Sequence, residues 1–161
     1  MGKQAIAIAK QKAVVLDSWA VLAYLEDEPA ADGVEAILEE AHDAGIPLLM
    51  TVVNAGEVWY SVARSQSERH ADENVLKELG DLGITLVDVS WALTRQAAAF
   101  KRHGRIAYAD CFAAALANAK RGSTGHGRPR VQAAGGTNLH SLGLENGRSC
   151  ERPYCVNSRF H

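Results

Sequence analysis

The chain has 161 residues, of which 47% are apolar and 22% are charged, as in an ordinary soluble globular protein. This length fits one domain with its own core, and no run approaches the roughly 18 apolar residues that a membrane span requires. The cysteines, Cys111, Cys150 and Cys155, show no metal-ligand spacing such as CxxC. We therefore expect a cytoplasmic protein without disulfides and without a membrane partner.

The net charge of −2 conceals a difference between two parts of the chain. Residues 1–120 carry 11 Lys and Arg against 17 Asp and Glu, a balance of −6, whereas residues 121–161 carry 6 against 2, a balance of +4. The second part holds seven of the 14 glycines and shows no helical or strand period. The sequence therefore predicts a folded domain over 1–120 and an irregular, basic, Gly-rich tail over 121–161, which we expect to be disordered.

Within residues 1–120, short β-branched apolar runs alternate with stretches of helical period. In chain order we expect a strand over 13–16, helices over 18–26 and 29–42, a strand over 48–52, helices over 54–66 and 71–79, a strand over 84–89, and helices over 90–103 and 108–120. Strands that alternate with helices predict an α/β fold. Its mainly parallel central sheet should be covered by helices on both faces, in three layers.

Three acidic residues lie where an apolar stretch meets the first turns of a helix: Asp17, Glu57 and Asp110. Carboxylates are rare in apolar settings unless something pairs them, and three that converge would repel one another. A divalent cation relieves this repulsion, and oxygen ligands suit Mg²⁺ or Mn²⁺. Because sites in open α/β sheets form beyond the carboxyl ends of the strands, the three acids predict a metal-dependent phosphodiesterase site.

Each acid also has a purely structural interpretation. Asp17 could cap the helix that starts at Ser18, and Asn54-x-x-Glu57 is close to a capping box. Asp110 could be a first-turn acid that complements the helix dipole. Only the combination of the three favours a shared site.

The segments VVLDSWAVLAYL, TVVNAGEVWYSVAR and IAYADCFAAALA, in this order and spacing, resemble the PIN-domain family. They are most similar to the VapC-type toxins of bacterial and archaeal toxin–antitoxin modules, and the resemblance covers residues 12–120. It implies a PIN-like fold and an endoribonuclease that uses Mg²⁺, or Mn²⁺, to cleave RNA. It also implies a small VapB-like antitoxin protein as partner, and we expect a homodimer as a further partnership.

Individual site residues follow from the same resemblance. Asp17, Glu57 and Asp110 match the metal-binding, catalytic acids of the family. Ser18 matches its usual hydroxyl, and Asn54 matches a polar position often found before the second acid. Both are predicted to contact the substrate.

A basic cluster precedes Asp110 and consists of Lys101, Arg102, His103 and Arg105. We predict that Lys101, Arg102 and Arg105 hold RNA phosphates beside the acids. The alternative is that these cations complement the dipole at the end of a helix.

The chain departs from the family pattern at Arg121. Where the family continues with a strand and a fourth acid, in a motif such as LVTGDPEF, this chain has RGSTGHGRPRVQ. With suitable codons, the DNA for residues 121–136 reads AAPLVTGDPEFKQLEG one base later, which favours a frameshift over a natural divergent tail. We therefore expect the last strand, which would lie beside the first, and the fourth carboxylate to be missing.

The missing acid leaves a second functional hypothesis open, namely a catalytically inactive PIN-like module that only binds its antitoxin or RNA. A flavodoxin-like ligand-binding domain is a third interpretation. It is disfavoured because no Gly-rich phosphate loop follows the first strand.

Overall fold

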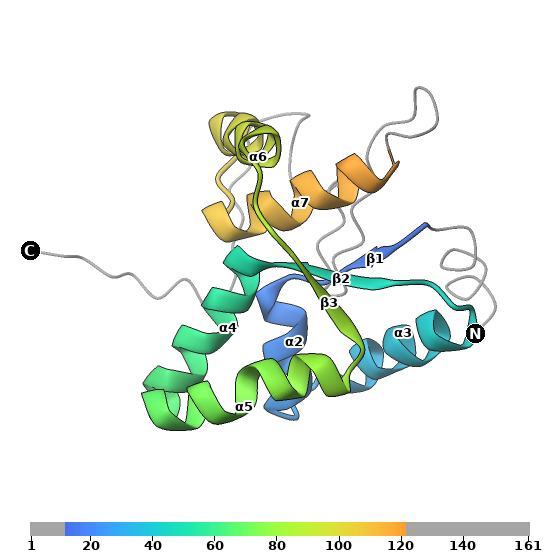
Figure 1. Ribbon diagram of the computed structural model, residues 1–161, viewed down its shortest axis with the longest axis vertical. Coiled ribbons are helices and arrows are strands. Elements are labelled where there is room, and N and C mark those ends of the chain that lie inside the picture. The colour runs from blue at the N-terminus through green and yellow to red at the C-terminus, as the bar shows by residue number, and fades with distance from the viewer. Residues whose placement is uncertain (1–11, 122–161) are drawn as a thin grey trace, which may run out of the picture.

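The computed structural model describes residues 12–121 and shows six helices and three strands there, in the expected order (Figure 1). The elements are β1 (Val14–Val15), α2 (Ser18–Leu25), α3 (Ala31–Asp43), β2 (Leu48–Thr51), α4 (Val52–Ser65), α5 (Glu68–Asp81), β3 (Ile84–Val87), α6 (Trp91–His103) and α7 (Tyr108–Arg121). None of these helices is long and apolar enough to cross a membrane. The predictions for the tail, including the frameshift, lie outside the described residues.

The three strands form one parallel sheet in the order β1-β2-β3. Val14 is in register with Leu48, and Leu48 with Ile84. Every connection between neighbouring strands passes through helices, as parallel pairing requires. The predicted α/β fold with a parallel sheet is thus confirmed, and β1 is an edge strand within residues 12–121.

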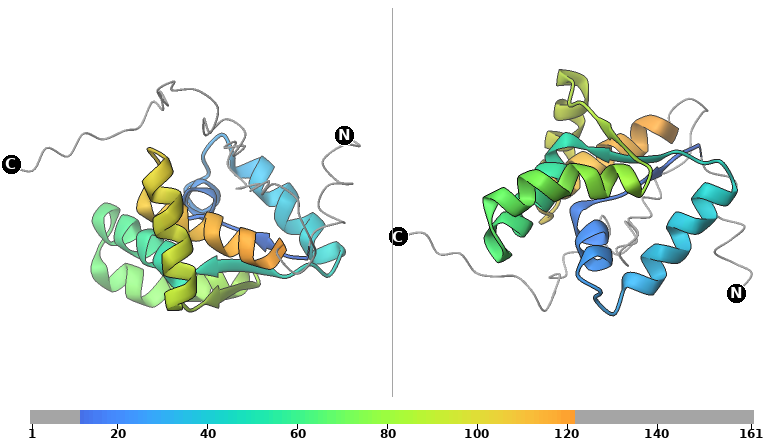
Figure 2. Two further views of the ribbon diagram at one scale, coloured as in Figure 1. Left: turned by 90° about the horizontal axis from the view of Figure 1, so that it is seen from above. Right: turned by 60° about the horizontal axis from the view of Figure 1, so that its bottom comes forward.

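Alternating side chains of the strands build one core on each face of the sheet. Leu48 and Met50 point into a core with α2, α3, α4 and α5, whereas Leu49 points into a second core with α6 and α7. The helices accordingly lie on opposite sides of the sheet in Figure 1, and α6 crosses α7 when the molecule is seen from above (Figure 2). This arrangement gives three layers, as predicted.

Side-chain caps explain where the helices begin. The Thr51 hydroxyl accepts the Asn54 backbone N–H at 3.2 Å, so α4 starts directly after β2, two residues earlier than the expected start at Asn54. The Ser67 hydroxyl caps α5 at Glu68, three residues before the expected start, because residues 68–70 are polar and add nothing to the apolar period. Ser90 caps α6 as predicted.

Candidate functional site

The acid-bearing turns of α2, α4 and α7 come together beside the ends of β1 and β2. Asp17 is the N-cap of α2, Glu57 lies in the second turn of α4, and Asp110 lies in the first turn of α7. Both α2 and α7 pack against α4, and the starts of the three helices lie near one another (Figure 1). The parallel sheet therefore carries the three acids to a common end of the molecule.

Asp17 and Glu57 are linked through Ser18. Oδ1 of Asp17 accepts the Ala20 backbone N–H at 2.9 Å, which makes the carboxylate the cap of α2 and leaves its residue only 7% exposed. The Ser18 hydroxyl donates a hydrogen bond to Oε2 of Glu57. This bond connects the start of α2 to α4 and fixes the Glu57 carboxylate next to the residue that follows Asp17.

Asn54 links α4 to the start of α7. Its side chain is fully buried, and its Oδ1 accepts the Thr51 hydroxyl at 2.6 Å. Its Nδ2 donates to the backbone carbonyl of Ala109, the residue before Asp110, at 3.1 Å. The sequence predicted a contact between Asn54 and RNA. In the structure, protein groups occupy both ends of the amide, so its visible role is to hold the first turn of α7 against α4.

The three carboxylates do not form a ready metal site. Among residues 12–121, no group of three or more His, Cys, Asp or Glu side chains is arranged so that it could hold a metal ion. The Asp17 carboxylate caps α2 through Oδ1, and that of Glu57 accepts the Ser18 hydroxyl through Oε2. The donor chemistry of three carboxylates suits a hard divalent cation, but their close convergence stays a prediction.

The basic cluster before Asp110 is exposed throughout, and one member, Lys101, also makes an internal hydrogen bond. Nζ of Lys101 donates to the backbone carbonyl of Ile106 at 2.6 Å and so braces the loop that leads into α7. Arg102, His103 and Arg105 are exposed. Only these three groups are positioned to meet an anion without breaking an internal hydrogen bond.

Cys111 follows Asp110 on the buried side of α7. The sequence predicted a small apolar helix residue, and the side chain is indeed fully buried. Burial raises the pKa of the thiol above its ordinary value, Lys101 lowers it by a smaller amount, and the charge of Asp110 raises it slightly. The thiol is therefore part of the core and not a nucleophile of the site.

The sequence matches the PIN domain family over residues 14–124, so the chain belongs to this family, whose members are generally nucleases. Among solved structures, its fold is similar to that of VapC20 from Mycobacterium tuberculosis, described as a toxin that cleaves the sarcin–ricin loop. The TM-score is 0.50 at 16% sequence identity, and the match covers 68% of this chain and 84% of that one. No curated protein matches the chain.

Proposed function

We propose that this chain is a metal-dependent endoribonuclease of the VapC kind, the toxin of a toxin–antitoxin pair. The observation that carries the proposal is the placement of Asp17, Glu57 and Asp110 at one end of the sheet in a PIN-family chain. The likeness in fold to a toxin described as cleaving the sarcin–ricin loop supports RNA as the substrate.

Each residue has a distinct task in this proposal. Asp17, Glu57 and Asp110 would hold Mg²⁺ or Mn²⁺, which supplies a water of lowered pKa and positive charge against the phosphate. Ser18 orients the Glu57 carboxylate through its hydroxyl hydrogen bond. The exposed guanidinium groups of Arg102 and Arg105 attract the RNA backbone from the segment that precedes Asp110.

The test separates the charge of Asp17 from its role as a helix cap. With an RNA that contains a sarcin–ricin loop, the purified chain should cleave in Mg²⁺, stop with EDTA, and resume when Mg²⁺ or Mn²⁺ is returned. Asp17→Asn keeps a capping oxygen for the Ala20 N–H but removes the charge, so cleavage should fall at least about a hundredfold with little change in Tm. Asp17→Ala should lose cleavage and also about 1 kcal/mol of stability.

Cleavage that survives EDTA, or full activity in Asp17→Asn, would contradict the metal mechanism. A wild-type chain that binds RNA or a small antitoxin but never cleaves would favour the second candidate, an inactive PIN-like module. That candidate rests on the departure from the family pattern at Arg121, where the fourth acid of the family is missing from the sequence.

The proposed partners are a small VapB-like antitoxin and a second copy of the chain. Co-expression with a small protein encoded beside the gene should yield a stable complex in which RNA cleavage is suppressed. Light scattering of the chain alone then shows whether it is a homodimer. An antitoxin that binds without suppressing cleavage would show that it is a partner of the chain but does not neutralise its activity.

A further inference from the structure

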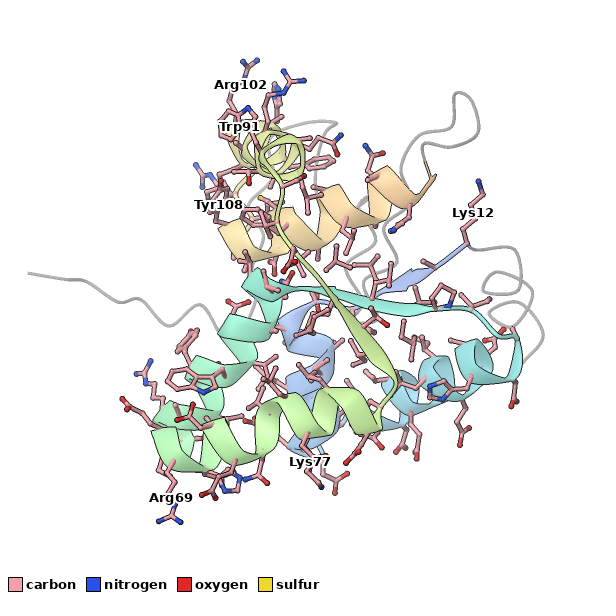
Figure 3. All side chains as sticks on the ribbon, in the orientation of Figure 1. Lys12, Arg69, Lys77, Trp91, Arg102 and Tyr108 are labelled. Carbon is pink, nitrogen blue, oxygen red and sulfur yellow. The ribbon has the colours of Figure 1, made fainter. Side chains whose placement is uncertain are left out.

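The outer face of α6 carries a large exposed aromatic ring and two arginines. Trp91 is 77% exposed, and Arg95 and Arg102 are exposed as well. Their spacing of i, i+4 and i+11 places them on one side of the helix, opposite the buried Leu93 and Ala97. Trp91 and Arg102 accordingly lie on the side of α6 that is turned away from α7 (Figure 3). We call Trp91, Arg95 and Arg102 the α6 stripe.

The electrostatic setting of the α6 stripe is positive. Helix α6 contains three Lys and Arg residues and no acid, and no Asp or Glu occurs from residue 89 to residue 109. The ion pairs recorded among the described residues, Arg69–Glu73 and Lys77–Asp81, both lie on α5. The guanidinium groups of the α6 stripe are therefore available to phosphates.

We propose that the α6 stripe binds an unpaired stretch of the RNA substrate, an inference that rests on the proposed function. Proteins that hold single-stranded RNA combine a cationic track with aromatic rings on which bases stack. A base in a duplex offers no free face, so Trp91 selects RNA whose bases are unstacked, as in loops. Arg95 and Arg102, about one and three turns further along the helix, supply positive charge for the backbone.

The α6 stripe is a poorer match for a protein partner. Trp91 is the one large exposed hydrophobic residue of α6 among the described residues, and its neighbours on the outer face include the small Ala98. A stable protein interface needs a fully buried apolar centre of several large side chains. One indole at the start of a helix face that also carries two guanidinium groups suits stacking and phosphate binding instead.

The α6 stripe begins near Asp110 and extends away from it along α6. Arg102 lies in the last turn of α6, where the chain passes through a short loop to Asp110 in the first turn of α7. Trp91 lies 11 residues earlier, about 16 Å along the helix axis at 1.5 Å per residue. RNA held at the acids therefore meets Arg102, then Arg95 and then Trp91 along α6, and Trp91 stacks a base several nucleotides from the cleaved bond.

The experiment measures binding in an Asp17→Asn background, so that cleavage does not consume the probe. The probe is a fluorescein-labelled oligouridine of about ten nucleotides, within the site sizes typical of single-strand binding proteins, and a duplex of equal length is compared with it. Trp91→Ala should weaken oligouridine binding about tenfold and leave duplex binding almost unchanged. Trp91→Phe keeps an aromatic face and should retain most of the affinity.

Two further measurements test the separate contributions of the two arginines and of the Trp91 ring to RNA binding. Arg95→Ala and Arg102→Ala should each weaken binding and reduce the salt slope by about 0.7, the value for one phosphate on a single strand. Oligouridine should quench tryptophan fluorescence, and Trp91→Phe should remove most of this quenching. Leu76→Ala and Lys77→Ala alter an exposed apolar residue and a cation on α5 and serve as matched controls, which should bind as the background does.

The outcomes test RNA binding by the α6 stripe separately from the proposed nuclease activity. If Trp91→Ala binds oligouridine as tightly as the background protein, with unchanged circular dichroism, the α6 stripe is not an RNA site. If Trp91→Ala instead abolishes antitoxin binding or self-association, the α6 stripe is a protein interface and the inference is wrong. If the wild-type chain never cleaves RNA but Trp91→Ala loses binding, the nuclease proposal fails and the α6 stripe stands.

Discussion

The two sides of the sheet are built alike inside and differ outside. Both cores are made of alternating strand residues packed against helices. On the outside, α3 carries five acids and no Lys or Arg, and α5 carries five acids against two cations, whereas α6 carries three cations and no acid. Figure 3 shows Arg69 and Lys77 of α5 at the opposite end of the molecule from Trp91 and Arg102 of α6. Surface charge, and not core construction, distinguishes the side that we propose meets RNA.

The core under α2–α5 contains more buried residues than the core under α6 and α7. The first includes Met50 and Leu79, whereas α7 contributes the small buried residues Ala113 and Ala115 to the second. Small side chains let α7 approach the sheet closely, and Asp110 is carried toward the ends of the strands by the same helix. We expect the first core to dominate stability and the packing of α7 to dominate the geometry of the site.

The largest stability effect should come from the α2–α5 core. Leu79→Ala on α5 removes a side chain that is 1% exposed and should lower the free energy of unfolding by about 2–5 kcal/mol. Leu76→Ala, three residues earlier on the same helix, removes one that is 65% exposed and should change it by less than about 0.5 kcal/mol. Urea unfolding measures both. Equal losses in the two variants would mean that the outer face of α5 is covered in solution.

A smaller loss of stability with a disproportionate loss of activity should follow Asn54→Ala. The substitution leaves the buried Thr51 hydroxyl and Ala109 carbonyl without their side-chain partner, at a cost of about 1–3 kcal/mol. The first turn of α7 then loses its tie to α4, so kcat for RNA cleavage and the affinity for Mn²⁺ should both fall.

The control for Asn54 is Asn74→Ala on α5. Asn74 bonds the carbonyl of His70 in its own helix, so its loss should cost less than about 1.5 kcal/mol and leave Mn²⁺ affinity unchanged. If Asn54→Ala is destabilised but binds Mn²⁺ as the wild type does, the tie between α4 and α7 does not position the acids.

The order and type of the elements were predictable because hydrophobic period and caps agree along residues 12–121. The start of α4 was not, since the β-branched Val52 and Val53 continue a strand pattern and only the Thr51 hydroxyl turns the chain into a helix there. Likewise, polar residues 68–70 hid the first turn of α5. Local hydrogen bonds decided the boundaries that the apolar pattern left open.

For the candidate site, the sequence predicted which acids share an end of the sheet but not the direction of their carboxylates. Those directions depend on partners such as the Ala20 N–H and the Ser18 hydroxyl, which no spacing reveals. The burial of Asn54 was missed for the same reason. The spacing of Trp91, Arg95 and Arg102 is visible in the sequence, but only the structure shows that this face of α6 is exposed.

The smallest effect that we predict is a pH dependence of stability at Cys111, under the side of the molecule that carries the basic helix. Burial raises the pKa of this thiol in the folded state. Above about pH 8.5, where an unfolded thiol begins to ionise, the unfolded chain releases a proton that the folded chain keeps. The unfolded state is thereby favoured, and this contribution to stability is complete below that pH and falls as pH rises, by at most about 1.4 kcal/mol per pH unit.

Cys111→Ala isolates this effect, because the other two cysteines, Cys150 and Cys155, are present in both proteins. Urea unfolding between pH 7 and pH 10 should show the wild type losing stability more steeply than the variant above about pH 8.5. Parallel curves would mean that the thiol reaches solvent in the folded state. Since Cys111 lies beside Asp110 on α7, that result would also mean that the first turn of α7 moves relative to the sheet. The core on this side of the sheet would then not be rigid, and its contrast with the exposed outer surface of α6 would be weaker.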